Sequence, residues 1–195
     1  MFHIEQNIKN GAYMSFLEYA LEFCDIATLL VRNHNKIVID SYNQRIMPEY
    51  EIGYCEELND PSEAVFYENA CRFVERIFEG DIVKAYYTSR YFTTLSGDEK
   101  KVYHIRFTEK TVRGLWDAES FFAWRYPFLP EDLCLFSKGK YWLINLAHER
   151  ELLIYDERPE TRALLQKFNI QFSEWSMDPK NIRGLNDFGG YDTPK

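Results

Sequence analysis

Apolar residues recur at helical spacing in two segments of the chain, and each segment opens with residues that favour a helix start. In the clearer one, Pro61 follows an N-cap aspartate, and apolar residues then recur every three or four positions until Gly80. In the other, Ser15 and Glu18 form an S-x-x-E capping box before an apolar face. The pattern therefore predicts one helix that begins near Pro61 and another over residues 15–24.

Two shorter helices are predicted in the C-terminal half. Asp117 is placed to cap a helix that ends before Pro127, since a proline cannot continue a helix. Pro159 fits the first position of another, whose apolar side holds Leu165 and Phe168.

Short runs of β-branched, aliphatic and aromatic residues predict strands between these helices. The first two runs, residues 26–31 and 37–40, flank the polar sequence R-N-H-N-K, which predicts a hairpin. A turn is expected at residues 96–99, where serine, glycine and aspartate follow one another. The other predicted strands cover residues 50–54, 82–88, 91–95, 102–107, 133–136, 141–146, 152–155 and 170–175.

These elements predict an α+β fold with a largely antiparallel sheet and three or four helices packed on one face. Strands outnumber helices and are joined by short turns, which disfavours a parallel β-α-β sheet. A length of 195 residues suits a single domain over residues 1–195, with a subdomain junction near residues 127–130. The glycine-containing tail, residues 177–195, is expected to be irregular.

The charge and composition of the chain narrow its partners. A net charge of −8 disfavours binding to nucleic acid or to an anionic membrane surface, because both require basic side chains. No apolar segment is long enough to cross a bilayer, and the charged N-terminal segment does not resemble a signal peptide. A cytoplasmic location with reduced cysteines is therefore expected. A basic protein partner and self-association are both compatible with this composition.

The motifs that suggest chemistry are incomplete. His148 begins an H-E-R-E-L sequence, but Leu152 stands where the helical zinc motif requires a second histidine, so a polar turn between strands is expected. Cys55 is the cysteine expected to be accessible, and Glu56 and Glu57 beside it disfavour a thiolate. The sequence thus predicts no catalytic residue, no metal ligand and no cofactor, which favours a non-enzymatic role without deciding it.

Seven acids and no Lys or Arg occur between residues 46 and 71. Asp60 and Glu63 complement the N-terminus of the predicted helix, but the other acids have no such local role. Two interpretations remain open: a solvated acidic face, or a docking surface for a basic partner. The second would use Glu49, Glu51, Tyr54, Glu56 and Glu57.

Six of the thirteen residues from 116 to 128 are aromatic. In a short helix that follows Asp117, Phe121 and Phe122 share one face and are predicted to enter the core, whereas Trp124 falls on another side. Trp, Tyr and Arg are the residue types that dominate binding hot spots. Core packing and partner contact therefore both remain open for a group of four residues, Trp116, Trp124, Arg125 and Tyr126.

Two functions fit these observations. The first is a non-catalytic protein–protein interaction protein, of which an acidic inhibitor or immunity protein for a basic partner is one form. The second is a binder or hydrolase of a carbohydrate or other small polar ligand, with an aromatic cleft and paired carboxylates. The carboxylates would come from Glu49, Glu51, Glu56 and Glu57.

Overall fold

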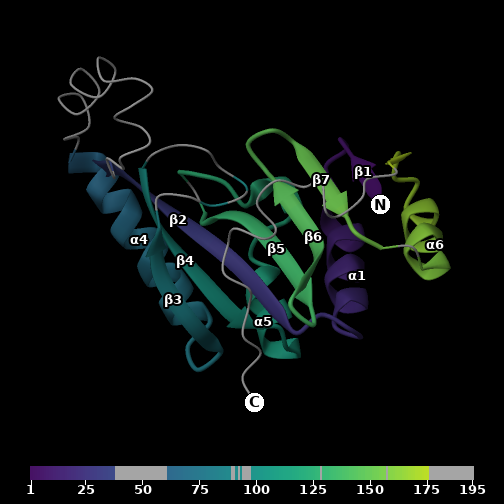
Figure 1. Cartoon of the computed structure of the whole chain (residues 1–195), viewed down its shortest axis with the longest axis horizontal. Coiled ribbons are helices and arrows are strands. Elements are labelled where there is room, and N and C mark those ends of the chain that lie inside the picture. The colour runs from purple at the N-terminus through teal and green to yellow at the C-terminus, as the bar shows by residue number, and fades with distance from the viewer. Residues whose placement is uncertain are drawn as a thin grey trace.

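The computed structural model of the chain describes residues 1–37, 61–88, 91, 93, 98–127, 129–156 and 158–175. Within these residues, eight strands form one antiparallel sheet in the order β3-β4-β2-β5-β6-β7-β1-β8 (Figure 1). The strands are β1 Phe2–Ile4, β2 Ile26–Ile37, β3 Ile82–Thr88, β4 Asp98–Arg106, β5 Glu131–Ser137, β6 Lys140–Leu146, β7 Glu151–Ile154 and β8 Ser173–Glu174.

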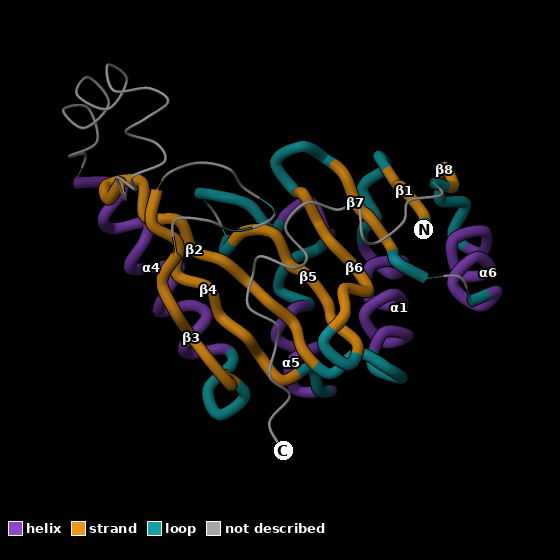
Figure 2. Tube along the Cα trace, viewed as in Figure 1, coloured by secondary structure: helices purple, strands orange, loops and turns teal. Residues whose placement is uncertain are grey.

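Three of the helices cover one face of this sheet, and the predicted α+β fold is confirmed. In Figure 2, α1, α4 and α5 all lie behind the strands, whereas α6 lies at the end of the sheet that carries β8. The main hydrophobic core fills the space between the sheet and these three helices. The helices are α1 Asn10–Ala20, α4 Pro61–Ile77, α5 Glu109–Leu115 and α6 Pro159–Lys167, with a short 3-10 turn, η1, at Phe121–Ala123.

The helix predicted to begin near Pro61 is α4, and the helix predicted at Pro159 is α6. Strand β3 covers the predicted residues 82–88, and β5 and β6 contain the predicted strands 133–136 and 141–146. Strand β7 matches the predicted strand 152–155 except at its last residue. In each of these segments the local sequence and the tertiary environment favour the same structure. The predicted strand at 50–54, most of the one at 91–95 and the tail 177–195 lie outside the described residues.

The hairpin predicted between residues 26 and 40 is wrong. The described part of this segment is one 12-residue strand, β2, which pairs with both β4 and β5. The polar residues do not turn, because Arg32 and His34 both contact Asp98 of the neighbouring strand. Asp98 and Glu99 accordingly belong to β4, although the sequence predicts a turn there.

The capping box at Ser15 is also wrong, because α1 begins five residues earlier, at Asn10. A backbone bridge between Lys9 and Ser120, together with a hydrogen bond from the Asn10 N–H to the Glu119 carbonyl, fixes this start. Ser15 consequently lies inside the helix. The helix then buries four side chains at helical spacing, Tyr13, Phe16, Leu17 and Ala20.

No α-helix begins at Asp117 in the described chain, and the sequence analysis missed the helix that precedes it. Helix α5 begins after Thr108, whose hydroxyl accepts a 3.2 Å hydrogen bond from the Thr111 N–H. The residues that follow Asp117 form only the short turn η1. Strand β1 was likewise not predicted, and β8 covers just two residues of the predicted 170–175. No helix among the described residues has both the length and the apolar character needed to cross a membrane.

Candidate functional site beside helix α4

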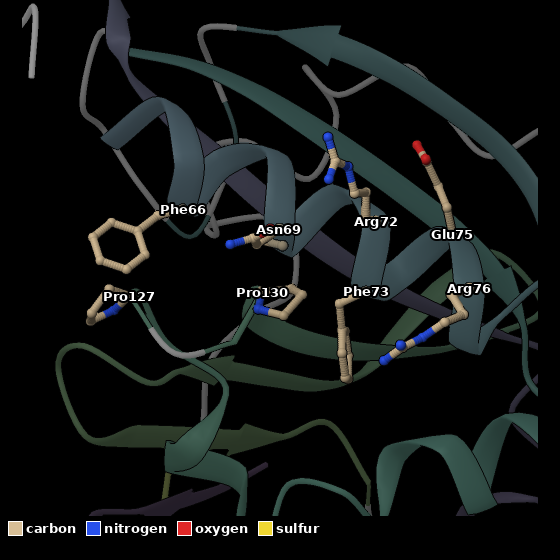
Figure 3. Close-up of a pocket in the computed structure, with 9 residues that line it drawn as sticks. Phe66, Asn69, Arg72, Phe73, Glu75, Arg76, Pro127 and Pro130 are labelled. Atoms are coloured by element: carbon tan, nitrogen blue, oxygen red, sulfur yellow. The ribbon is translucent and has the colours of Figure 1, made fainter. Parts of the chain in front are cut away.

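A groove separates helix α4 from the segment that connects η1 to β5 (Figure 3). Its volume is about 720 Å³, which lies within the usual range of ligand pockets. In Figure 3, Phe66 of α4 and Pro127 of the connecting segment face each other across the opening. We call this site the α4 groove. Its lining combines rings with charged side chains: Phe66, Asn69, Ala70, Arg72, Phe73, Glu75, Arg76, Pro127 and Pro130.

Helix α4 carries apolar side chains on more than the face that packs on the sheet. Cys71 and Val74 are buried, as expected for that face. Phe66 lies nearer the start of the helix than Cys71 and is 40% exposed. Its neighbour Val65 is also exposed. Isolated exposed apolar residues are ordinary, but adjacent ones beside a ring-lined hollow are typical of a binding surface.

The structure separates the residues of the aromatic run. Phe121 and Phe122 are buried, as predicted. Trp124 is fully buried as well, so the core alternative holds for this residue: its ring lies 6.5 Å from that of Phe73, behind the groove. Tyr126 is half-buried at the groove, where its ring lies 6.0 Å from that of Phe66.

Trp116 and Arg125, the other two members of the four-residue group in the aromatic run, lie away from the α4 groove. Trp116 follows α5 and is 37% exposed. Arg125 is exposed and lines a different hollow, together with Arg150. The run thus supplies this groove with Pro127 in its lining, with the Tyr126 ring next to Phe66, and with the Trp124 ring behind Phe73. A role for these residues in partner binding remains a prediction.

The residues that the sequence predicts for an acidic docking surface are not described. Glu49, Glu51, Tyr54, Glu56 and Glu57 lie outside the described residues. The described end of the acidic segment is the first half of α4, which forms one wall of the groove. There Glu68 is exposed and pairs with Arg72 across 2.9 Å.

The charged residues of the groove differ in how they are paired. Glu75 accepts hydrogen bonds of 2.8 Å from Lys101 and 2.9 Å from the Tyr103 hydroxyl, and these bonds lower the pKa of its carboxyl group. Arg76 has no ion-pair partner among the described residues and remains available to a ligand. The groove therefore offers a ligand its rings and the Arg76 guanidinium, because Glu75 and Arg72 are already paired within the protein.

A cluster of buried charges lies beside the inner end of the groove, where β2, β4 and β5 meet. Arg32 contacts two carboxylates, with Nε 2.9 Å from Asp98 and Nη1 3.7 Å from Glu131. The Lys100 side chain is fully buried and donates to the Asp98 carbonyl over 2.7 Å. His34 joins the cluster through Asp98, and its ring also contacts Tyr126.

Burial shifts the pKa values in this cluster. It raises the pKa of Glu131 to about 7, against the opposing effect of Arg32. It lowers the pKa of Lys100 to about 8, although Asp98 favours the charged form. Glu131 lines a very small cavity that shares Phe66 and Pro127 with the α4 groove. Perturbed carboxyl and amine groups beside a cavity are typical of functional sites.

No motif in the sequence marks this cluster, although its residues carry a signal. Arg32 and His34 lie in the polar segment that was taken for a turn, and Glu131 and Asp132 form an acidic pair just before an apolar strand. A polar or charged residue in a strand requires a partner when its side chain is buried. One sequence does not reveal that the two segments are neighbours.

The remaining candidate chemistry has structural explanations. His148 lies in the turn between β6 and β7, as expected, and its Nδ1 is 3.7 Å from Asp132, which raises the pKa of the imidazole. Cys24, Cys71 and Cys134 are free and buried, and burial raises the pKa of Cys24 and Cys134. Cys55 lies outside the described residues, among which no group of His, Cys, Asp and Glu has a metal-binding arrangement.

Comparison with known proteins found no matching family, no similar curated protein and no similar solved structure.

Proposed function

We propose that this protein is a non-catalytic interaction protein that binds a segment of a partner protein in the α4 groove. The observation that carries the proposal is the exposure of Phe66 at the α4 groove, where its ring lies next to that of Tyr126. Aromatic side chains beside a hollow are the usual anchors of protein interfaces. An apolar side chain of the partner would lie between Phe66 and Pro127.

We further propose that the partner is basic, as for an inhibitor or immunity-type protein. The chain carries a net charge of −8, and its acidic segment continues into the helix that forms the groove wall. Acids around the groove would attract a partner that carries Lys or Arg, whereas the Arg76 guanidinium inside the groove would bind an oxygen of the same segment. Glu51, Glu56 and Glu57 would supply this charge, together with Glu68 on α4.

A capture experiment with matched variants tests this function. Native lysate is passed over the immobilised protein, and captured proteins are quantified by mass spectrometry. Phe66→Ala should reduce capture of one abundant basic protein at least about tenfold, as expected for a hot-spot residue. The charge reversal of Glu51, Glu56 and Glu57 to Lys should abolish capture of the same protein while leaving the Tm nearly unchanged.

Trp175→Ala is the matched control. Trp175 is also an exposed aromatic residue, but it follows β8 at the opposite end of the sheet from α4. Its removal should leave capture unchanged. Equal capture by the wild type, Phe66→Ala and the triple variant would rule out the α4 groove as the docking site.

A second candidate function is binding or hydrolysis of a neutral sugar, and one described observation favours it. Asp98 and Glu131 both approach Arg32, so two carboxylates lie near one another beside Tyr126. The acids expected from the sequence for this role, Glu49, Glu51, Glu56 and Glu57, lie outside the described residues. The test is turnover of a panel of nitrophenyl glycosides by the wild type and by Glu131→Gln. Activity that disappears in the variant would support an enzyme, and the absence of turnover by the wild type would favour the interaction protein.

A further inference from the structure

A second hollow lies on the side of η1 that faces the N-terminal segment. Its volume is about 550 Å³, and its lining brings together residues that are far apart in the sequence. Asn7 comes from the segment after β1, Ser120 and Arg125 come from either side of η1, and Arg150 comes from the turn before β7. We call it the η1 hollow.

The frame of the η1 hollow is held by hydrogen bonds. The Asn7 amide donates to the Ser120 hydroxyl over 3.1 Å and accepts from the Phe122 N–H over 3.2 Å. The Arg125 N–H donates 2.8 Å to the Ala123 carbonyl, which fixes the backbone that carries the guanidinium. Since Ser120 uses its oxygen as an acceptor here, its own O–H remains able to donate to a ligand.

Positive charge predominates in this hollow. Among the described residues, no carboxylate pairs with Arg125 or Arg150, and both side chains are exposed. The one acid in the lining is Glu5. A guanidinium presents a planar set of N–H donors that matches the oxygens of a carboxylate or a phosphate. Arg125, Arg150 and Ser120 all line the hollow, so it offers two guanidinium groups and a hydroxyl to an oxyanion.

Arg150 is the last residue of the turn between β6 and β7, and the turn fixes its backbone. Its φ is 60°, in the left-handed region that glycine and asparagine adopt more easily than arginine. Three other described residues with positive φ are Asn or Asp, and Lys138 lies in a two-residue hairpin turn.

We propose that the η1 hollow binds a small organic anion, a carboxylate or a phosphate monoester. Arg125 and Arg150 would bind the anionic group, and the Ser120 hydroxyl would donate a third hydrogen bond. Phe122 lines the same hollow and would contact the apolar part of the ligand. This site is separate from the α4 groove, so the two proposals can fail independently.

Calorimetric titration with four probes tests the proposal. Phenyl phosphate and phenylacetate carry the two candidate anionic groups, 2-phenylethanol is the uncharged control, and inorganic phosphate lacks the ring. At least one of the two ring-bearing anions should bind with a Kd on the order of 1 mM or tighter. The affinity should fall with added salt, and 2-phenylethanol should not bind. The preferred anion distinguishes a carboxylate site from a phosphate site.

Three variants assign the binding to this hollow. Arg125→Gln and Arg150→Gly should each weaken binding at least about tenfold. Arg113→Gln removes an exposed arginine of α5 that does not line the hollow, and it should bind as the wild type does. Arg150→Gly also relieves the left-handed backbone, so its Tm should be unchanged or higher while binding is lost.

This combination separates a ligand site from a structural role, since a structural arginine would lower the Tm when it is replaced. Absence of saturable binding by both ring-bearing anions would overturn the proposal. Binding that Arg125→Gln and Arg150→Gly leave unchanged would overturn it equally, because the anion would then occupy another place.

Discussion

The indole N–H of Trp124 donates a 2.9 Å hydrogen bond to the hydroxyl of Tyr13, which lies 111 positions earlier in the chain. The Tyr13 hydroxyl in turn donates to the Leu115 carbonyl over 2.9 Å. Both side chains are almost completely buried. These two hydrogen bonds join α1 to the segment after η1 and to the end of α5, behind the sheet.

Trp124→Phe is expected to lower the free energy of unfolding by about 1–3 kcal/mol, because it removes this donor and leaves unfilled volume. Trp116→Phe is the matched control: the same substitution at an exposed position should change stability by less than about 0.5 kcal/mol. Chemical denaturation followed by circular dichroism measures both. Equal effects of the two substitutions would contradict the structural role assigned to Trp124.

Gly114 provides a prediction about the packing of α5. A Cβ atom at this position would lie 2.6 Å from Ile77 Cγ2 and 2.9 Å from Phe78 Cε1. Gly114→Ala should therefore destabilise the protein by about 1–3 kcal/mol, although alanine favours a helix. At Gly11 of α1, a Cβ atom would contact nothing within 4 Å, so Gly11→Ala should stabilise by up to about 1 kcal/mol. Thermal unfolding of the two variants should shift in opposite directions.

The buried carboxyl group of Glu131 predicts a specific pH dependence. Burial raises its pKa in the folded protein to about 7, above the ordinary value of 4.5. The folded state consequently binds more protons than the unfolded state between these values, and stability falls as the pH rises from about 4.5 to about 7. Glu131→Gln removes this dependence and should be more favourable at pH 8 than at pH 5, by on the order of 1–3 kcal/mol relative to the wild type.

Denaturant unfolding at the two pH values measures the difference. Glu149→Gln replaces an exposed glutamate of the neighbouring turn and serves as the control, with little change at either pH. If the Glu131→Gln variant and the wild type lost stability equally between pH 5 and pH 8, the assignment of this pKa would be wrong.

Asp156 predicts the opposite dependence. Burial opposes its ionisation, but hydrogen bonds from Arg158, Thr161 and Trp142 outweigh this effect and lower its pKa to about 2. The stability that the ionised group contributes is complete above about pH 4 and is lost as the pH falls toward 2. Asp156→Asn should cost about 2 kcal/mol at pH 7 and clearly less at pH 2.

Glu160→Gln is the control for this substitution, because Glu160 lies exposed in the first turn of the same helix, α6. Its stability should follow that of the wild type across the same pH range. A constant cost of Asp156→Asn from pH 7 to pH 2 would show that the carboxylate charge does not matter.

The elements that the sequence predicted are those in which local pattern and tertiary environment agree. Helix α4 combines a proline at its start, a buried apolar face and Gly80 after its end, where φ is 79°. The hairpin of β5 and β6 is equally local, because Lys138 and Gly139 both adopt the positive φ that a two-residue turn requires.

The failures have tertiary causes. The S-x-x-E sequence at Ser15 is a genuine cap pattern, but the bridge between Lys9 and Ser120 starts the helix earlier. Arg32 and His34 read as turn residues because nothing near them in the sequence explains buried charge. Their partner, Asp98, is supplied by a strand more than sixty positions away.

The candidate sites divide in the same way. The helical spacing within the aromatic run predicts that Phe121 and Phe122 enter the core, and both are buried. It did not determine that Trp124 is buried while Trp116 is exposed, because the direction of each ring depends on η1 and on Tyr13. Neither the α4 groove nor the η1 hollow has a sequence motif, since each is lined by segments that meet only in the folded chain.

The α+β class, the amphipathic helix α4, the strands joined by short turns and the negative charge all follow from the amino-acid sequence, because they depend on composition and on neighbouring residues. Contacts between distant segments set which carboxylates pair with Arg32, which aromatic rings leave the core, and which arginines line the η1 hollow. The physical reason is that contact energies depend on distance in space, and the fold sets that distance for residues that are far apart along the chain.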